Sequence, residues 1–364
     1  MRIIPLNLNY NFYKRTPLEN SFGVYSSPVF ASNTSAGNPL KKLRGIKCPY
    51  FGIEMLSGKD ITNIERKLDQ CNNVNDVVKT LSKYKKNMQM IEKNIFKRFE
   101  KCSTTHPDFK LQNCLKMWYH DALIKLKLEE FSVLDDIDKL SLKLTPENAL
   151  LVHSKTTEFR QIILKNEQSR TFKRKMLLDS LDKIKPSKKE RKIFADIKDK
   201  ATYMPTSGTS ENAFIVKYAS RSHQEIAKRI LKPSVATIEH IKPNSKKGEN
   251  DIGNFILVSN GANCLRSNTP LYRFIKRFPK IPNLCQNTIN QIIKIINANK
   301  FRGHETYPYE VKRTFAQESK GTILLDLSQC KYNEEQAILA EKSAHDYKKK
   351  SKIKENINSE NPII

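Results

Sequence analysis

Between Asp60 and Tyr203 the apolar residues recur at spacings of three and four, with Lys, Arg and Glu between them. This period gathers apolar side chains on one face of an α-helix and differs from the alternation typical of a strand. Pro107 interrupts the pattern, and Thr145 followed by Pro146 is a typical helix start. We therefore expect a mainly helical region, with helices over 146–165, 168–184 and 187–202.

The charge of the chain is strongly positive. Lys and Arg number 65 against 38 Asp and Glu, which gives a formal net charge of +27. Such a charge favours a polyanionic partner, most simply nucleic acid, although a generally lysine-rich surface is a competing explanation. Glycine occurs only 11 times in 364 residues, and no glycine-rich phosphate-binding loop is present.

The seven cysteines are scattered and form no CxxC pair. This pattern predicts reduced thiols and a cytoplasmic protein without a disulfide framework. No apolar run approaches the roughly 18 residues of a membrane helix, so we expect no membrane partner. Residues 1–45 are rich in Asn, Ser, Pro and Gly and are expected to form a disordered leader. The Lys-rich end near 348–354 is expected to be a frayed tail.

The segment 237–268 carries the residues that indicate a reaction. Glu239 and His240 end one apolar stretch, a polar turn follows, and Asn254 opens a second apolar stretch. We expect two short strands within 234–258 and a helix from Asn263 to Phe278. An amide at Asn254 can bond across the hairpin and fix the loop that carries His240. Asn263 offers an amide oxygen, and Arg266, one helical turn later, is a candidate for holding phosphate.

These residue types suit phosphodiester hydrolysis. Histidine can deprotonate a water molecule because its unperturbed pKa lies near neutral pH. Carboxylate and amide oxygens are ligands that a hard divalent cation prefers, and such a cation neutralises charge on the phosphate. Lys246 and Lys247 in the turn are candidates for contacts with a nucleic-acid backbone, although solvated turn lysines explain them equally well. The net charge of 231–310 is also positive, which favours a phosphate-facing surface.

The same segment resembles the HNH endonucleases, which fold as two antiparallel strands and a helix around one metal ion. The resemblance rests on five ordered elements: Glu239-His240-Ile-Lys-Pro243, Gly248, Asn254-Phe-Ile-Leu257, Ala262-Asn263, and Arg266-Ser267-Asn268. It covers about 30 residues closely. It implies that Glu239 and Asn263 are metal ligands for one divalent cation, Mg²⁺ or alternatively Mn²⁺. It further implies that His240 is the general base and that Asn254 orients it. Arg266 stands where lysine is usual.

Many members of that family also hold a structural zinc with two CxxC pairs. Here Cys48-Pro-Tyr-Phe51 resembles the first pair, with Phe51 in place of the second cysteine, and Ser259-Asn-Gly-Ala262 stands where the second pair would be. Three of four thiolates are missing, so we expect no structural zinc and interpret Cys48 as a buried thiol. The remnants predict that residues 46–56 pack beside the hairpin, with apolar contacts in place of the metal.

We thus expect an α+β, mainly helical protein with a small ββα-metal nuclease module and a large helical insertion. The expected parts are a leader (1–45), the first part of the module (46–59), the helical domain or insertion (60–205), the HNH-like module (206–310), and a C-terminal helix with a basic tail (311–364). The expected function is a metal-dependent DNA endonuclease, with RNA left open. The alternatives are a non-catalytic nucleic-acid-binding protein on a decayed nuclease fold and a helical scaffold. The sequence gives no indication of oligomeric state.

Overall fold

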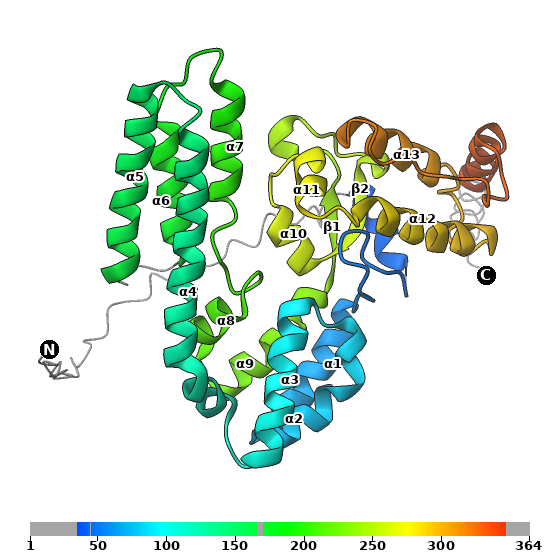
Figure 1. Ribbon diagram of the computed structural model, residues 1–364. Helices are drawn as coiled ribbons and strands as arrows, with labels where there is room; N and C mark the ends of the chain where they lie inside the picture. Colours follow the sequence, from blue (N-terminus) through cyan, green and yellow to red (C-terminus); the bar gives the residue numbers. More distant parts are fainter. Residues whose placement is uncertain (1–34, 44, 166–169, 347–364) are drawn as a thin grey trace, which may run out of the picture.

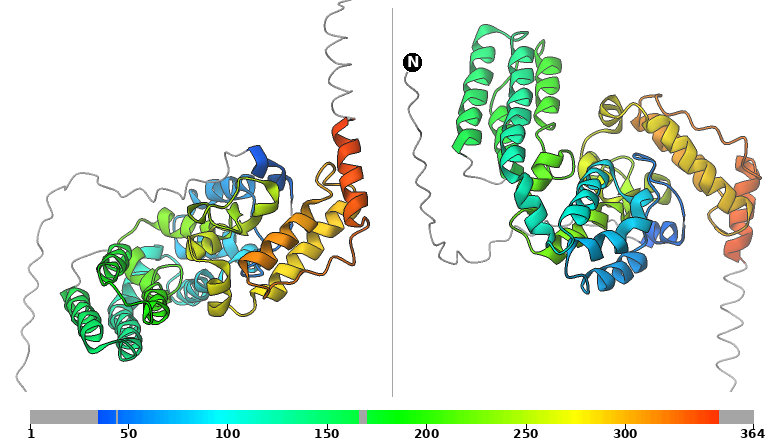
Figure 2. Two further views of the ribbon diagram at one scale, coloured as in Figure 1. Left: turned by 90° about the horizontal axis from the view of Figure 1, so that it is seen from above. Right: turned by 60° about the horizontal axis from the view of Figure 1, so that its bottom comes forward.

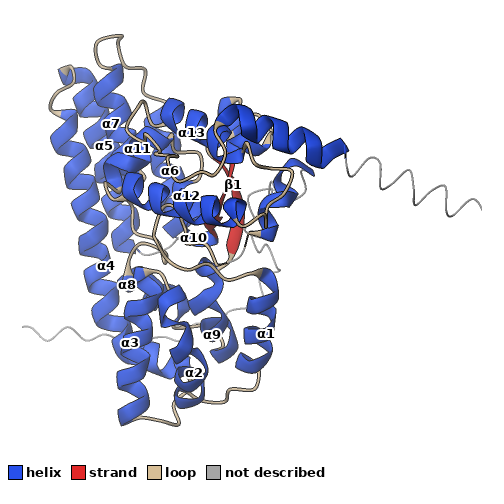
Figure 3. Ribbon diagram, turned by 90° about the vertical axis from the view of Figure 1, so that its right-hand side faces the viewer, coloured by secondary structure: helices blue, strands red, loops and turns tan. Residues whose placement is uncertain are grey.

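The computed structural model describes residues 35–43, 45–165 and 170–346, and its class is the expected α+β, mainly helical one (Figure 1). The strands, coloured red in Figure 3, form one antiparallel two-stranded sheet among helices. The helices before the sheet are α1 (Gly58–Leu68), α2 (Val74–Leu81), α3 (Met90–Thr105), α4 (Leu111–Ser141), α5 (Pro146–Lys165), α6 (Arg170–Asp182), α7 (Arg191–Ala201), α8 (Glu211–Tyr218) and α9 (His223–Leu231). Short 3₁₀ helices are η2 (Ser35–Lys42), η3 (Ser82–Asn87), η4 (Lys232–Ser234), η5 (Asn244–Lys246) and η6 (Ile252–Asn254).

The sheet is a hairpin of β1 (Ala236–His240) and β2 (Phe255–Ser259), in a register that places His240 opposite Phe255. Helix α10 (Asn260–Arg266) follows β2 directly and contacts both strands. The expected pair of strands is therefore confirmed. The single helix expected over 263–278 is instead two short helices, α10 and α11 (Leu271–Arg277), separated at Pro270.

A continuous apolar core surrounds the hairpin. Its buried residues come from two distant parts of the chain, 40–55 and 238–327. Helices α12 (Ile281–Asn297) and α13 (Tyr307–Glu318) contribute to it, and so do Ile323 and Leu325 beyond them. We call residues 40–55 and 235–330 the hairpin module. Its core reaches past residue 310, the boundary expected from the sequence, because α13 and the segment after it bury apolar side chains against it.

The end of the expected leader also belongs to this module. Residues 1–34 lie outside the described residues, but 35–42 form η2, and Leu40 and Leu43 are buried against the hairpin core. The two leucines are three residues apart and thus share one face of a 3₁₀ helix. The expectation that 46–56 pack beside the hairpin is confirmed, since Leu56 N donates to Ser234 O at 2.9 Å and Ala236 N donates to Leu56 O at 2.8 Å.

The helical insertion leaves and re-enters the hairpin module at this point, because Leu56 and Val235 form an isolated parallel bridge. Gln89 reinforces the junction: its buried amide Nε2 donates to Pro233 O at 3.1 Å and to Ser259 Oγ at 3.0 Å. A Cβ on Gly261 would lie 2.5 Å from this amide, so any larger residue at the start of α10 would displace the side chain of Gln89. The insertion is therefore fixed to the base of the hairpin.

The insertion has two cores, joined by the long helix α4. The first half of α4 packs with α1–α3, α8 and α9, which together we call the helical lobe. The second half packs with α5–α7 as a distal bundle, which extends away from the helical lobe in Figures 1 and 2. Helices α8 and α9 thus belong to the insertion, whereas the sequence placed residues from 206 onward with the hairpin. The reason is their apolar face, which includes Phe214, Ile226 and Ile230 and is buried in the lobe.

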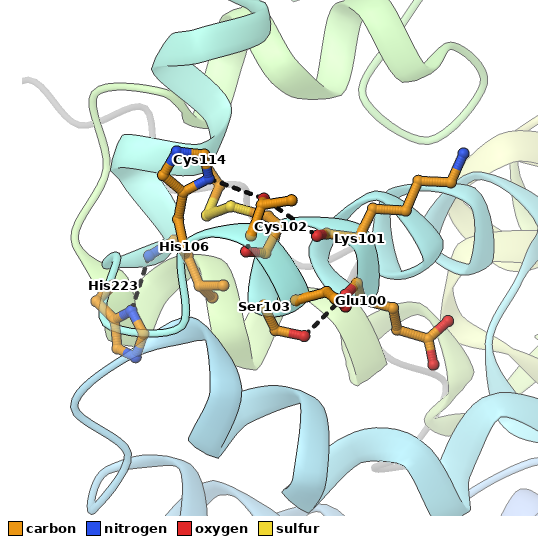
Figure 4. Close-up of a disulfide and its surroundings, with 10 residues drawn as sticks. Glu100, Lys101, Cys102, Ser103, His106, Cys114 and His223 are labelled. Carbon is orange, nitrogen blue, oxygen red and sulfur yellow. Dashed lines mark hydrogen bonds between the residues drawn. A yellow bond between two sulfur atoms is a disulfide. The ribbon is translucent and has the colours of Figure 1, made fainter.

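One cysteine pair departs from the expectation of reduced thiols. A disulfide joins Cys102, in the last turn of α3, to Cys114, in the first turn of α4 (Figure 4). The turn between the two helices brings Cα atoms twelve residues apart to 6.5 Å, a separation that a disulfide spans. His223 lies close by and its Nδ1 accepts a hydrogen bond from Leu111 N. The other five cysteines are free.

Across residues 35–43, 45–165 and 170–346, no helix combines the length and apolar character needed to cross a bilayer. The basic tail near 348–354 lies outside the described residues.

Candidate active site at the end of the hairpin

The loop between β1 and β2 is held by the buried side chain of Asn254. Its Oδ1 accepts a hydrogen bond from Lys242 N at 2.8 Å, and its Nδ2 donates to Lys242 O at 3.2 Å and to Glu249 O at 2.8 Å. Asp251 caps the same corner, because its Oδ1 accepts from Asn254 N at 3.0 Å. Asn254 thus makes the cross-hairpin bonds expected of it, and it sets the path of the chain directly after His240.

Gly248 lets this loop close. A Cβ at Gly248 would lie 1.9 Å from Lys242 O and 2.9 Å from Asn254 Nδ2, so only glycine can approach this backbone. Lys247, just before it, has a left-handed φ of 62°. Lys246 and Lys247 are both exposed at the tip of the loop, where their ammonium groups face solvent.

His240 is half-buried at the end of β1, with its ring edge-on to Phe255 at 4.6 Å between centroids. Its Nε2 lies 2.8 Å from Asn250 Oδ1. An amide oxygen only accepts hydrogen bonds, so Nε2 carries the proton of the neutral ring and Nδ1 is the basic nitrogen. Nδ1 has no hydrogen-bond partner within the described residues. The ring is therefore oriented for accepting a proton at Nδ1.

Glu239 and Asn263 lie on the face of β1 that α10 covers, opposite to His240. Asn263 donates from Nδ2 to Thr237 Oγ1 at 3.3 Å, and Thr237 shares this face of the strand with Glu239. The side-chain oxygen Oδ1 of Asn263 makes no hydrogen bond to any described residue, whereas its backbone oxygen accepts from Ser267 N at 2.8 Å. Glu239 is buried, with 5% of its side chain exposed, and one of its oxygens is bonded to Arg266.

The expectation that Arg266 holds phosphate at the surface is wrong, because Arg266 lies in the core. Its side chain is fully buried, and Nη1 donates to Glu239 Oε1 and, at 2.8 Å, to His240 O. Nη2 donates to Ile241 O, and Tyr50 lies under the guanidinium. A guanidinium enclosed in this way cannot reach a phosphate. The physical reason is that Glu239 and two strand-end carbonyls accept hydrogen bonds from both Nη atoms in the core, where solvent does not compete.

Burial raises the pKa of Glu239 to about 7, and the positive charge of Arg266 lowers it only in part. The second carboxylate oxygen, Oε2, is buried without a hydrogen-bond partner, and so is Nε of Arg266. An unpaired buried carboxylate oxygen is costly, and it is the atom on which a cation would be expected to bind. Glu239 Oε2 and the side-chain oxygen Oδ1 of Asn263 are both of the ligand type that a hard divalent cation prefers. Such a cation would share Glu239 with Arg266.

Among the described residues no group of three or more His, Cys, Asp and Glu side chains has the geometry of a metal site. An ion at Glu239 and Asn263 would therefore complete its coordination with water and with oxygens of the substrate, as is usual for Mg²⁺.

The two segments that the resemblance likened to cysteine pairs, 48–51 and 259–262, are in contact. Cys48 Sγ is buried 3.4 Å from both the backbone nitrogen and the hydroxyl oxygen of Ser259, and burial raises the pKa of the Cys48 thiol. The turn after Cys48 closes through Gly52, whose φ is +68° and whose nitrogen donates to Cys48 O at 2.8 Å. Phe51 packs edge-on against Phe278 at 5.6 Å between centroids. Apolar contacts thus fill the place of the second cysteine.

Sequence reasoning missed Asn250, the partner of His240, and Tyr50, the partner of Arg266. Asn250 lies in a turn that is rich in polar side chains, several of which could bond to a histidine. No sequence signal therefore distinguishes Asn250 from its neighbours. Tyr50 could have been found, because it lies inside the Cys48–Phe51 remnant that was expected to contact the hairpin.

Comparisons with models of protein families, with curated proteins and with solved structures found no match to this chain.

The close approach at Gly248 gives a first prediction. Gly248→Ala is expected to destabilise the protein by about 1–3 kcal/mol, because the methyl group collides with backbone and the loop must shift. The midpoint of urea unfolding measures this. Gly58→Ala is the control, since a Cβ there meets nothing within 4 Å. Equal stability of the two variants would contradict the assigned loop structure.

The buried pair gives a second prediction. Arg266→Met leaves a buried carboxylate without its partner and is expected to cost roughly 3–5 kcal/mol of unfolding free energy. Glu239→Gln combined with Arg266→Met should cost less than the sum of the two single changes, because the unpaired charge is gone. Arg313→Met is the control, since its ion pair with Glu334 is exposed and contributes about 0–1 kcal/mol. Additive costs would show that Arg266 and Glu239 do not interact.

Proposed function

We propose that this protein is a metal-dependent nuclease of the HNH type that hydrolyses phosphodiester bonds in DNA. The observation that carries the proposal is the geometry of His240. It ends β1 with Nδ1 unpaired and Nε2 held by Asn250, on a loop that Asn254 fixes. The buried carboxylate of Glu239 and the side-chain amide of Asn263 further support it, although they lie on the opposite face of β1 within the same ββα hairpin.

In this proposal His240 accepts a proton from the attacking water at Nδ1, and its ring keeps its orientation through Asn250 and Phe255. Asn254 acts as a positioning residue through the loop. Glu239 and Asn263 would hold one divalent cation, Mg²⁺ or Mn²⁺, which would supply positive charge to the phosphate and leaving oxygen. Lys246 and Lys247 remain candidates for contacts with the DNA backbone because they are exposed near the same end of the hairpin.

A second candidate is a non-catalytic nucleic-acid-binding protein on a decayed nuclease fold. The Glu239–Arg266 pair favours it, because a guanidinium already neutralises the carboxylate that the cation would need. The net charge of +27 supports nucleic-acid binding under either candidate.

Cleavage of supercoiled plasmid in Mg²⁺ or Mn²⁺ tests the first candidate. His240→Ala is expected to slow cleavage by at least about 100-fold, because general-base catalysis contributes roughly 10²–10⁴-fold. His120→Ala, an exposed histidine on α4, should cleave like the wild type. Equal rates for wild type and His240→Ala would reject His240 as the base.

Metal binding separates the two candidates without relying on activity. Titration of Mn²⁺, followed by the spin-resonance signal of the free ion, should show one site in the wild type. Asn263→Leu is expected to weaken that site at least tenfold, since loss of even a supporting group costs about 10–100-fold. Asn113→Leu, on the exposed surface of α4, is the control. Salt-dependent DNA binding without any Mn²⁺ site would favour the second candidate.

A further inference from the structure

A large cleft lies between the hairpin module and the helical lobe. Its volume is about 1600 Å³, more than the roughly 300–1,000 Å³ of pockets for small ligands. One wall consists of β1 and α10, including Thr237, Asn260 and Cys264, and the other of α1, η3, α8 and α9. Neither Glu239 nor His240 lines it. Thr237 does, and His240 is three residues further along β1, or roughly 10 Å.

The cleft is basic. Nine Lys and Arg side chains line it, against five Asp and Glu. Some of these cations form ion pairs with acidic side chains, such as Lys86 with Glu54 and Arg229 with Glu92. The cations on the walls without an ion pair to any described residue are Lys67, Lys83, Lys232 and Arg174. Glu65 also lines the cleft without an ion pair to a described residue, so it offsets one of these cations. The positive charge that remains is distributed along the cleft.

Two arginines lie near each other beside the cleft, and one of them lines it. Arg174, on α6, lines the cleft, and Arg277, at the end of α11, is close enough for its charge to lower the pKa of Arg174 beyond the larger effect of burial. Arg277 stacks on Tyr203 with 4.1 Å between the guanidinium carbon and the ring centroid. Neither arginine makes an ion pair with a described residue at salt-bridge distance, although the charge of Asp199 opposes in part the lowering of the Arg277 pKa by burial. Two partly buried cations that repel each other form a site for an anion.

The aromatic lining of the cleft selects among nucleic acids, because only a strand with unpaired bases can stack on it. Tyr84 lines the same cleft with Lys83 over its ring at 5.1 Å. A basic groove with an aromatic side chain for base stacking is the arrangement that single strands prefer.

We propose that this cleft binds single-stranded nucleic acid, with Arg174 and Arg277 holding its phosphates and Tyr84 stacking on a base. The proposal rests on the proposed function only in taking nucleic acid as the partner. The strand would run along α10 and past Thr237 toward His240.

The test uses the full chain carrying His240→Ala, in EDTA, so that binding is measured without cleavage. Fluorescence anisotropy compares a 20-nucleotide DNA strand, the same RNA strand and the blunt DNA duplex across a salt series. The single strands are expected to bind more tightly than the duplex. The double change Arg174→Gln and Arg277→Gln should weaken strand binding at least fivefold and reduce the salt slope by about 1.4, since each lost phosphate contact accounts for about 0.7.

Tyr84→Leu should also weaken strand binding about fivefold or more, through lost stacking, but leave the salt slope unchanged. Arg191→Gln with Arg313→Gln removes the same charge away from the cleft and should bind like the parent. The arginine double variant also loses the stacking of Arg277 on Tyr203, so its thermal midpoint is measured and binding is compared well below it.

Unchanged strand binding by the arginine variant would overturn the proposal, and so would a duplex that binds as tightly as the strand. Either result leaves the nuclease proposal standing if plasmid cleavage still depends on His240. Absence of all nucleic-acid binding by the parent chain would instead reject the proposed function together with the cleft.

Discussion

The end of β1 depends on a guanidinium buried in the core. Arg266 bonds to Glu239, to His240 O and to Ile241 O, so one side chain from α10 fixes both the acidic residue and the backbone that carries the histidine. A guanidinium without such partners would be expensive to bury. Strand β1, helix α10 and the candidate site therefore form one hydrogen-bonded unit. A substitution that moves Arg266 is expected to move the backbone of His240 as well.

The core around this unit is large for so short a hairpin. A two-stranded hairpin has few residues with which to bury a core, and a structural metal is one common solution. Here Cys48 and Ser259 meet directly, and apolar residues from η2 to Leu327 surround them. The helices α12 and α13 and the segment before residue 56 thus supply the burial that stabilises the hairpin.

Much of this could be predicted from the sequence. The period of apolar residues gave the helices of the insertion nearly to the residue over 146–165, and the spacing from His240 to Asn254 gave the hairpin and its cross-bond. These features are local, since each follows from a pattern within about twenty residues. The chemistry assigned to the site remains a proposal, because a pattern names residues without placing their side chains.

The features that the sequence did not indicate depend on contacts between distant segments. Arg266 looked like a surface cation because its acceptors, two backbone carbonyls, have no sequence signature. Helices α8 and α9 were assigned to the hairpin module because they directly precede it in the sequence. Their apolar faces are instead buried against α1–α4. The Cys102–Cys114 disulfide was missed because only the turn between α3 and α4 makes a spacing of twelve close.

The Glu239–Arg266 pair also constrains how the proposed site would work. Arg266 and a divalent cation near the same carboxylate repel each other, and burial weakens the solvent screening between them. A phosphate brings negative charge to the same place and offsets that repulsion. Binding of cation and substrate at Glu239 and Asn263 would then be mutually favourable, and such coupling is reciprocal by thermodynamic necessity. A carboxylate shared in this way would keep the resting protein neutral at its core and would hold the cation firmly only when nucleic acid is present.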